Sequence, residues 1–158
     1  MANRIAVMEN GRVRQIATPA ELYEAPNSRF VADFIGKINL FDGEATASDG
    51  EKVKVSSPLF GQFTATSAAT GKVSVAVRPE KFRVLRDKPG EAGLVATQGK
   101  VSDIAYYGGY SNLFVDVGQG QPIMIDVTNA ARTTGQTFTA GQPVWCAFRP
   151  DDALILTD

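Results

Sequence analysis

The chain after Leu40 carries the pattern that most constrains its fold, because short apolar runs alternate there with turn residues. The runs are rich in Val, Ile, Phe and Thr, and Gly, Pro, Asp and Ser separate them. This spacing favours many short antiparallel strands in a barrel or a sandwich. The small, polar stretch 128–141 is expected to be a longer connection. Strands are predicted at about 40–46, 52–55, 62–66, 73–78, 82–86, 94–106, 111–117, 122–127, 144–149 and 153–156.

The first residues carry different signals, which predict a hairpin. Asn10-Gly11 lies between two runs that contain apolar residues. A tight two-residue turn needs a positive φ at both central positions, and Asn-Gly tolerates this conformation. We therefore predict a β-hairpin within residues 5–16.

A short helix is predicted after the hairpin. Thr18 is a good N-cap, Pro19 suits the first helical position, and Glu21 completes a capping box. The helix must be brief because Pro26 follows it closely.

A second short helix is predicted from its caps and its apolar residues. Asn27 or Ser28 can serve as the N-cap, and Gly36 suits the C′ position, where a left-handed residue often ends a helix. The predicted apolar face consists of Phe30, Val31, Phe34 and Ile35.

One short pattern occurs twice in the body of the chain. Residues 75–85 and 146–156 each contain a strand that ends at Arg, a Pro, an acidic residue and a second strand. Proline explains why the first strand stops, since it removes a backbone donor and fixes φ. Two interpretations stay open: two similar turns, or a barrel or two half-barrels in which equivalent strands reuse one corner.

Composition disfavours several functions. The chain has 158 residues, a net charge of −1 and a pI of about 5.5, so it lacks the basic surplus that nucleic-acid binding needs. The lone Cys146 cannot form an internal disulfide, which fits a reducing cytoplasm, and its apolar neighbours predict a small core residue. The chain has no His, the commonest general base and metal ligand, so no metal site is expected.

No phosphate-binding loop is found in the sequence. Such a loop needs Gly-x4-Gly-Lys followed by Ser or Thr, so that backbone amides meet the phosphates. The nearest approach, residues 93–101, has one residue too many between its glycines and ends in Val. We therefore expect that these residues do not hydrolyse ATP. The missing His also excludes a Ser-His triad, whereas a Ser-Lys arrangement stays open.

The first forty residues contain, in order, the strings Ile5-Ala-Val-Met, Gly11-Arg-Val-x-Gln-Ile, Thr18-Pro-x-Glu-Leu-Tyr and Phe30-Val-Ala-x-Phe-Ile-Gly36. With these strings the segment resembles the last part of the nucleotide-binding subunit of bacterial ABC importers of the spermidine/putrescine, iron and sugar types. Ala17 departs from this resemblance, because the family usually has Gly there.

The rest of the chain contains, in order, the strings Val77-Arg78-Pro79-Glu80, Gly99-Lys-Val-x-Asp-Ile-Ala-Tyr-Tyr-Gly108 and Phe148-Arg-Pro-Asp-Asp-Ala-Leu-Ile-Leu156. With these strings it resembles the TOBE (transport-associated OB) domain, which follows the nucleotide-binding domain in many such subunits. The resemblance implies that residues 1–38 are the tail of a nucleotide-binding domain and that residues 39–158 are a TOBE domain.

The resemblance implies a mainly β fold, an OB-like β-barrel preceded by the hairpin and the two short helices. It implies a non-catalytic, regulatory and dimerising part of an importer ATPase, of the polyamine or a related class. No cofactor is expected in these residues, since ATP and magnesium would bind upstream. The expected partners are a second copy of the subunit, the upstream ATPase domain and, through it, the membrane permease. This arrangement would place the protein in the cytoplasm, on the inner face of the cell membrane.

Six residues are candidates for interface or regulatory contacts: Arg78, Glu80, Tyr107, Tyr110, Arg149 and Asp151. The arginines and acids could instead form salt-linked turns within the domain. The tyrosines flank Gly108-Gly109 and are expected to cover one end of the barrel. Alternatively, a small solute would bind near Tyr107, Tyr110 and the Arg-Pro-acid corners, at the barrel or at a dimer seam, and the chain would act as a sensor that biases transport. The Ser-Ala-Arg-Asn signature of the molybdate-binding branch is absent, so oxyanion storage is not expected.

The predicted hairpin also bears on assembly. An isolated two-stranded hairpin is only marginally stable, and the sheet that it would complete is missing here. We expect it to pair with the same segment of another copy or to pack on the barrel.

Overall fold

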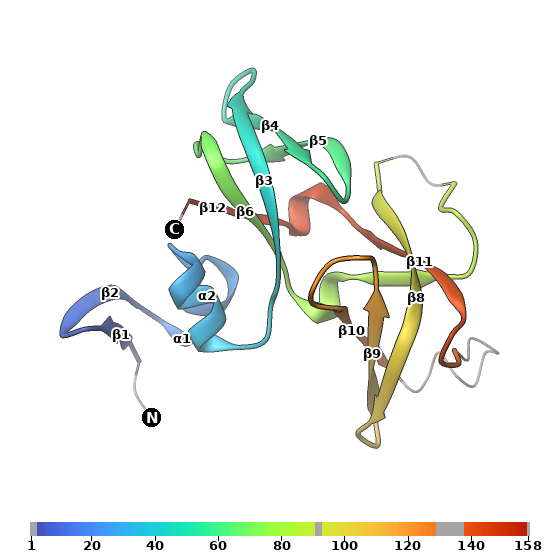
Figure 1. The fold of residues 1–158 in the computed structure, drawn as a ribbon. Coiled ribbons are helices and arrows are strands. Elements are labelled where there is room, and N and C mark those ends of the chain that lie inside the picture. Colours follow the sequence, from blue (N-terminus) through green and yellow to red (C-terminus); the bar gives the residue numbers. More distant parts are fainter. Residues whose placement is uncertain (1–2, 91–92, 129–137, 158) are drawn as a thin grey trace.

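The computed structural model describes residues 3–90, 93–128 and 138–157, and it is mainly β (Figure 1). The helices are α1 (Pro19–Glu24) and α2 (Arg29–Ile35), and the short 3-10 helices are η1 (Pro79–Lys81) and η2 (Pro150–Asp152). The strands are β1 (Ile5–Glu9), β2 (Arg12–Ala17), β3 (Asn39–Ala47), β4 (Lys52–Ser57), β5 (Gly61–Thr66), β6 (Gly71–Val77), β7 (Arg83–Leu85), β8 (Val95–Tyr106), β9 (Tyr110–Asp116), β10 (Ile123–Thr128), β11 (Pro143–Phe148) and β12 (Leu154–Leu156). Every strand predicted from the sequence is found close to its predicted bounds. Of the predicted connection 128–141, residues 129–137 lie outside the described part.

The hairpin and both helices form a small N-terminal unit, residues 5–35, beside the β-sheets (Figure 1). Asn10 and Gly11 have φ values of 52° and 78°, so the predicted tight turn is confirmed. The buried residues of the unit are Val7, Ala17, Leu22 and Val31, which come from the hairpin and from both helices. The hairpin therefore buries Val7 and Ala17 against α1 and α2 and not against the barrel.

Each helix begins at a hydroxyl cap. The Thr18 hydroxyl accepts a hydrogen bond from the Glu21 backbone N–H at 3.2 Å, and the Ser28 hydroxyl accepts one from the Val31 N–H at 3.2 Å. Ser28 is thus the N-cap of α2 rather than Asn27. Only half of the predicted capping box forms, because the Glu21 side chain makes no hydrogen bond to Thr18 among the described residues.

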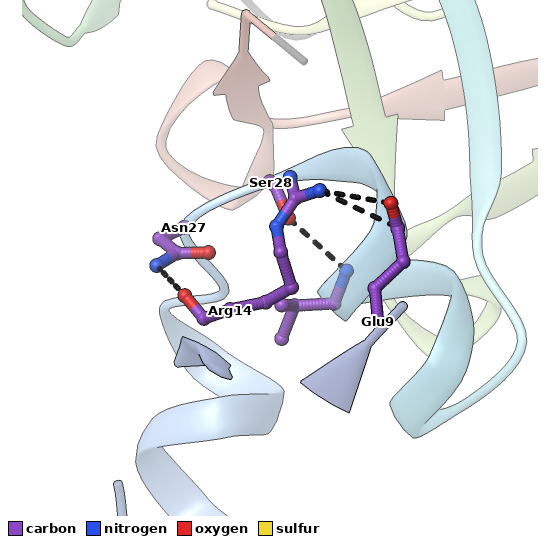
Figure 2. Close-up of polar contacts among 5 residues, drawn as sticks. Glu9, Arg14, Asn27 and Ser28 are labelled. Carbon is purple, nitrogen blue, oxygen red and sulfur yellow. Dashed lines mark hydrogen bonds and ion pairs between the residues drawn. The ribbon is translucent and has the colours of Figure 1, made fainter. Parts of the chain in front are cut away.

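Asn27 instead joins the hairpin to the start of α2 (Figure 2). Its side-chain amide donates to the Arg14 carbonyl at 2.7 Å, and the Arg14 guanidinium reaches the Glu9 carboxylate at 3.2 Å. These local bonds hold the β1–β2 turn and the loop before α2 in one unit.

Two expectations for α2 are wrong. Gly36 is the C-cap and has φ −178°, an extended conformation that any residue adopts, so no left-handed residue ends this helix. Phe34 is 64% exposed, so it does not share the buried face on which Val31 lies. The buried residues of this seven-residue helix are Val31 and Ala32, so neighbouring elements cover only one side of it.

The other strands form two antiparallel sheets, with the orders β12-β6-β3-β4-β5 and β7-β11-β8-β9-β10. The chain crosses between them twice. It passes from β6 through η1 into β7 of the second sheet, and it returns from β11 through η2 into β12 of the first. Each sheet therefore takes its last strand from the other half of the chain (Figure 1).

The two halves have the same topology, strand for strand, when β3 is matched with β8 and β7 with β12. The repeated Arg-Pro-acid corner lies at the crossing in both halves. Gly43 and Gly99 also occupy matched positions, and each faces a backbone carbonyl of the next strand, that of Ser56 or Asp116. Of the two interpretations left open above, the structure supports equivalent half-barrels that reuse one corner.

The main core lies between the two sheets and is built around phenylalanine rings. Phe148 of β11 contacts Phe60, Phe63 and Phe82 edge to face, with ring centroids 5.1, 5.7 and 5.6 Å apart. Cys146, two residues earlier, is also fully buried, and burial raises the pKa of its thiol to about 12. The prediction that Cys146 is a small core residue is confirmed.

Asn39 joins the two sheets at one edge. Its side-chain amide donates to the carbonyls of Val77 at 3.2 Å and Met124 at 2.9 Å, and its oxygen accepts from the Met124 N–H at 2.8 Å. Met124 belongs to the edge strand β10 of the second sheet. This buried amide thus replaces strand pairing where β3 and β10 meet.

A substitution of Gly99 tests the close approach of β8 and β9. A Cβ at this position would lie 2.6 Å from the Asp116 carbonyl oxygen, whereas at Gly43 it would lie 3.2 Å from that of Ser56. We expect Gly99→Ala to destabilise the protein by about 2 kcal/mol and Gly43→Ala by less than about 1 kcal/mol. Urea unfolding measures both, with Gly120→Ala, which has open space, as the control. Equal stabilities of the three variants would contradict this account of the strand contact.

Candidate functional site

Arg78 is the best-connected candidate residue, and it joins the N-terminal unit to the barrel. It follows β6, is 4% exposed, and donates hydrogen bonds to the carbonyls of Ala32, Gly36, Lys37 and Tyr23 at 3.1–3.2 Å. These carbonyls belong to the ends of α1 and α2, where helices leave carbonyls without partners. The guanidinium thus caps both helices, which explains why α2 needs no left-handed glycine.

Tyr23 and Glu80 complete this corner. The Arg78 guanidinium lies over the Tyr23 ring, 4.2 Å from its centroid, and the Tyr23 hydroxyl donates to the Glu80 carboxylate. Burial and this hydrogen bond raise the pKa of Tyr23 to about 12. Burial lowers the pKa of Arg78, an effect that Tyr23 and Glu80 oppose. Among the described residues no ion pair joins Arg78 to Glu80, so the corner is held through Tyr23 rather than by a direct salt link.

A second carboxylate extends the corner towards β10. Asp126 accepts a hydrogen bond from the side-chain amide of Asn112, which is buried in β9. Burial and the charge of Glu80 raise the pKa of Asp126, while the Asn112 amide and Lys37 act in the opposite direction. The first Arg-Pro corner is therefore a polar junction between the N-terminal unit and both sheets.

The second corner differs from the first although the backbone repeats. Arg149 and Asp151 flank Pro150 at η2, and both side chains are exposed. No part of the N-terminal unit covers them as it covers Arg78, because that unit occurs only once. The structure thus places the matched arginines in different surroundings, one buried and one at the surface.

Tyr107 and Tyr110 lie at the tip of the β8–β9 hairpin. Their rings stack with centroids 5.2 Å apart, and the Tyr107 N–H donates to the Tyr110 carbonyl at 2.9 Å. The rings are 52% and 44% exposed. The expectation that they cover the end of the barrel is therefore wrong, whereas solute binding near them stays a prediction.

The sequence did not single out Tyr23, Asn39 or Asp126. Tyr23 and Asp126 reach the corner from elements far from Arg78 in the chain. Asn39 is a polar residue just before the predicted strand 40–46, and its burial is visible only in the structure. Among the described residues, no group of three or more His, Cys, Asp or Glu side chains is placed to hold a metal ion. Within the same residues, no helix has the length and apolar character needed to cross a lipid bilayer.

Relatives with similar sequences are ATP-binding proteins of polyamine import. The spermidine/putrescine import ATP-binding protein PotA 2 of Pseudomonas aeruginosa is 35% identical over 155 residues, which cover 96% of this chain and 43% of the relative. The putrescine transport ATP-binding protein PotG of Escherichia coli is 34% identical, with 99% of this chain and 43% of the relative covered. The chain thus spans about two fifths of the length of these relatives.

The fold is similar to that of the cytoplasmic molybdate-binding protein ModG, whose structure was solved with molybdate bound. The TM-score is 0.64 over 76% of this chain and 96% of that chain, at 16% identity. This similarity and the strands of the structure confirm the predicted mainly β, OB-like barrel, and the structure itself shows the preceding hairpin and two short helices.

The sequence profile of the TOBE domain matches residues 75–156, which are more than half of the chain. The match begins in β6 and includes both Arg-Pro corners and all of the second half-barrel. The chain therefore belongs to the TOBE domain family.

Proposed function

We propose that the chain is the C-terminal part of the ATP-binding subunit of an ABC importer. In this proposal residues 39–158 are a non-catalytic regulatory and dimerising domain, and residues 1–38 end the nucleotide-binding domain. The names of the relatives support polyamines, spermidine or putrescine, as the transported class. ATP and magnesium would bind upstream. A second copy and the permease would be its partners, in the cytoplasm at the inner face of the membrane.

An exposed apolar surface on the N-terminal unit carries this proposal. Met8 and Val13 face each other across the hairpin, and both are 52% exposed. Large apolar side chains gathered at a surface mark a site of interaction. The N-terminal unit is fixed to the barrel through Arg78, so a domain bound to this surface would be coupled to the barrel. The surface, called the hairpin patch below, consists of Met8, Val13 and Ile16, which share the face of the hairpin opposite to the buried Val7.

A chimera tests the proposed function. The chain replaces the aligned part of PotA 2 in Pseudomonas aeruginosa cells that lack this protein, and uptake of labelled spermidine is measured. We expect uptake to be restored, and we expect no ATP hydrolysis by the 158-residue chain alone. A chimera that is produced and reaches the permease but does not support uptake would contradict the proposal, and so would ATP hydrolysis by the chain itself.

The hairpin patch also predicts the assembly of the isolated chain. Without a partner domain, we expect the patches of two copies to meet, because this removes apolar surface from water. Val13→Glu should therefore convert a dimer to a monomer in light scattering, since a charge would be buried at the contact. Lys54→Glu, on the exposed side of β4, is the matched control and should leave the dimer intact. A dimer that survives Val13→Glu would show that the patch is not its cause.

A further inference from the structure

A groove crosses the outer face of the first sheet, and none of its lining residues belongs to either Arg-Pro corner or to the hairpin patch. It has a volume of about 580 Å³, within the usual range for small-molecule sites. It is lined by Arg29, Asp42, Gly43, Glu44, Ser56, Ser57, Pro58, Lys72, Val73, Ser74 and Thr157.

The groove exists because α2 covers only part of this sheet face. Side chains alternate along a strand, so Leu40, Asp42 and Glu44 of β3 share the face opposite to Phe41. Ala32 of α2 packs over the apolar end of this face, where Leu40 and its neighbours lie. The polar continuation of the same face is left open, and Arg29 at the start of α2 lines it.

Both signs of charge face the groove. Asp42 and Glu44 supply two carboxylates from one strand, and Arg29 and Lys72 supply two cations from other elements. Glu44 and Lys72 are direct partners across β3 and β6, yet no ion pair joins them within the described ranges. These charged side chains can therefore bind a ligand instead of one another.

Ser74 adds a hydroxyl to the wall of the groove. It lies opposite Asp42 in the sheet, is 4% exposed and lines the groove. Among the described residues the buried side-chain atom without a hydrogen-bond partner is Arg78 Nε, so the Ser74 hydroxyl is not left without a partner inside the core. It offers a bound group one neutral hydrogen bond beside the charged side chains.

We propose that this groove binds a small zwitterion, a molecule with one ammonium and one carboxylate group, as in an amino acid. The ammonium would lie against Asp42 and Glu44, the carboxylate against Arg29 and Lys72, and Ser74 would add a neutral hydrogen bond. A diamine would bring a second positive charge to the two cations, and a diacid a second negative charge to the carboxylates. Like charges at short distance repel, so only a ligand with both signs satisfies the whole groove.

Straight-chain amino acids of increasing length test this site on the full chain. Glycine, β-alanine, γ-aminobutyrate, 5-aminovalerate and 6-aminohexanoate are titrated by calorimetry at physiological salt. Putrescine, which carries only positive charges, and succinate, which carries only negative charges, are the comparison ligands of matched length. We expect one amino acid to bind best, with a Kd below about 1 mM. Putrescine and succinate should each bind at least about tenfold more weakly than that amino acid. Putrescine or succinate binding as tightly as the best amino acid would overturn the proposal, and so would no amino acid binding below about 1 mM.

Variants locate the binding. Asp42→Asn and Ser74→Ala each remove one proposed contact and should weaken the binding of the best amino acid. For Asp42→Asn the Kd should rise about tenfold, because a hydrogen bond to a charged group is lost. Asp49→Asn removes a nearby exposed carboxylate outside the groove and should leave the Kd unchanged. Circular dichroism checks that each variant is folded. Equal affinities of Asp42→Asn and Asp49→Asn would overturn the assignment of the groove.

Discussion

Replacement of Phe148 by Ala is expected to destabilise the protein by about 3–5 kcal/mol, the usual cost of removing a buried phenylalanine ring. Phe148 is fully buried, and its ring contacts three other phenylalanines. It lies in β11 of the second sheet, whereas Phe63 lies in β5 of the first. The cavity would therefore open between the sheets, where neither sheet alone can close it.

Urea unfolding followed by the fluorescence of Trp145, the only tryptophan, measures this effect. Phe34→Ala is the matched control, because the same ring is 64% exposed there and its removal should cost less than about 0.5 kcal/mol. If Phe148→Ala were no more destabilising than Phe34→Ala, the core between the sheets would not be the main source of stability.

Arg78→Met is expected to release the N-terminal unit from the barrel, with a loss of about 3 kcal/mol. The methionine side chain keeps part of the apolar contact but removes four hydrogen bonds from a charged donor and the stacking on Tyr23. Hydrogen bonds from charged groups are the stronger kind, and their loss leaves helix-end carbonyls without partners. The effect is expected to be largest in residues 5–35.

Hydrogen exchange measured along the chain tests this expectation, because it separates local release from global unfolding. Protection should fall in α1 and α2 and persist in β8 and β9. Arg149→Met changes the matched arginine of the second corner, which lies at the surface, and should leave the exchange of residues 5–35 unaltered. Equal exchange patterns in the two variants would contradict the capping role of Arg78.

Local features could be predicted from the sequence because their causes lie within a few residues. The caps Thr18 and Ser28 each bond to a backbone N–H three residues away, and Asn10-Gly11 forms the turn that its own conformational preferences favour. The strands were predicted for the same reason, since alternation and turn residues are visible along the chain.

The role of Arg78 could not be predicted in this way. Its carbonyl partners lie 41 to 55 residues earlier, and only the packing of α1 and α2 beside β6 brings them to the guanidinium. Asn39 is a stronger example, because its partner Met124 is 85 residues away. Phe34 shows the converse, because its spacing places it on an apolar face, whereas its side chain is 64% exposed in the described structure.

The repeated corner was visible in the sequence, but its meaning was not. Two Arg-Pro-acid turns fit either interpretation until strand order is known, because pairing between β6 and β12 depends on where both halves of the chain lie. The pairing settles the question in favour of matched halves.

The reciprocal exchange of β7 and β12 makes this chain equivalent to a strand-swapped dimer whose two protomers have been joined end to end. The joined form replaces an encounter between separate molecules by one within a single molecule, where the effective concentration of the partner half is high and independent of dilution. Fusion also frees the two copies to diverge, because a change in one half is no longer imposed on the other. The matched arginines differ in this way: Arg78 is buried and holds the N-terminal unit, while Arg149 lies at the surface.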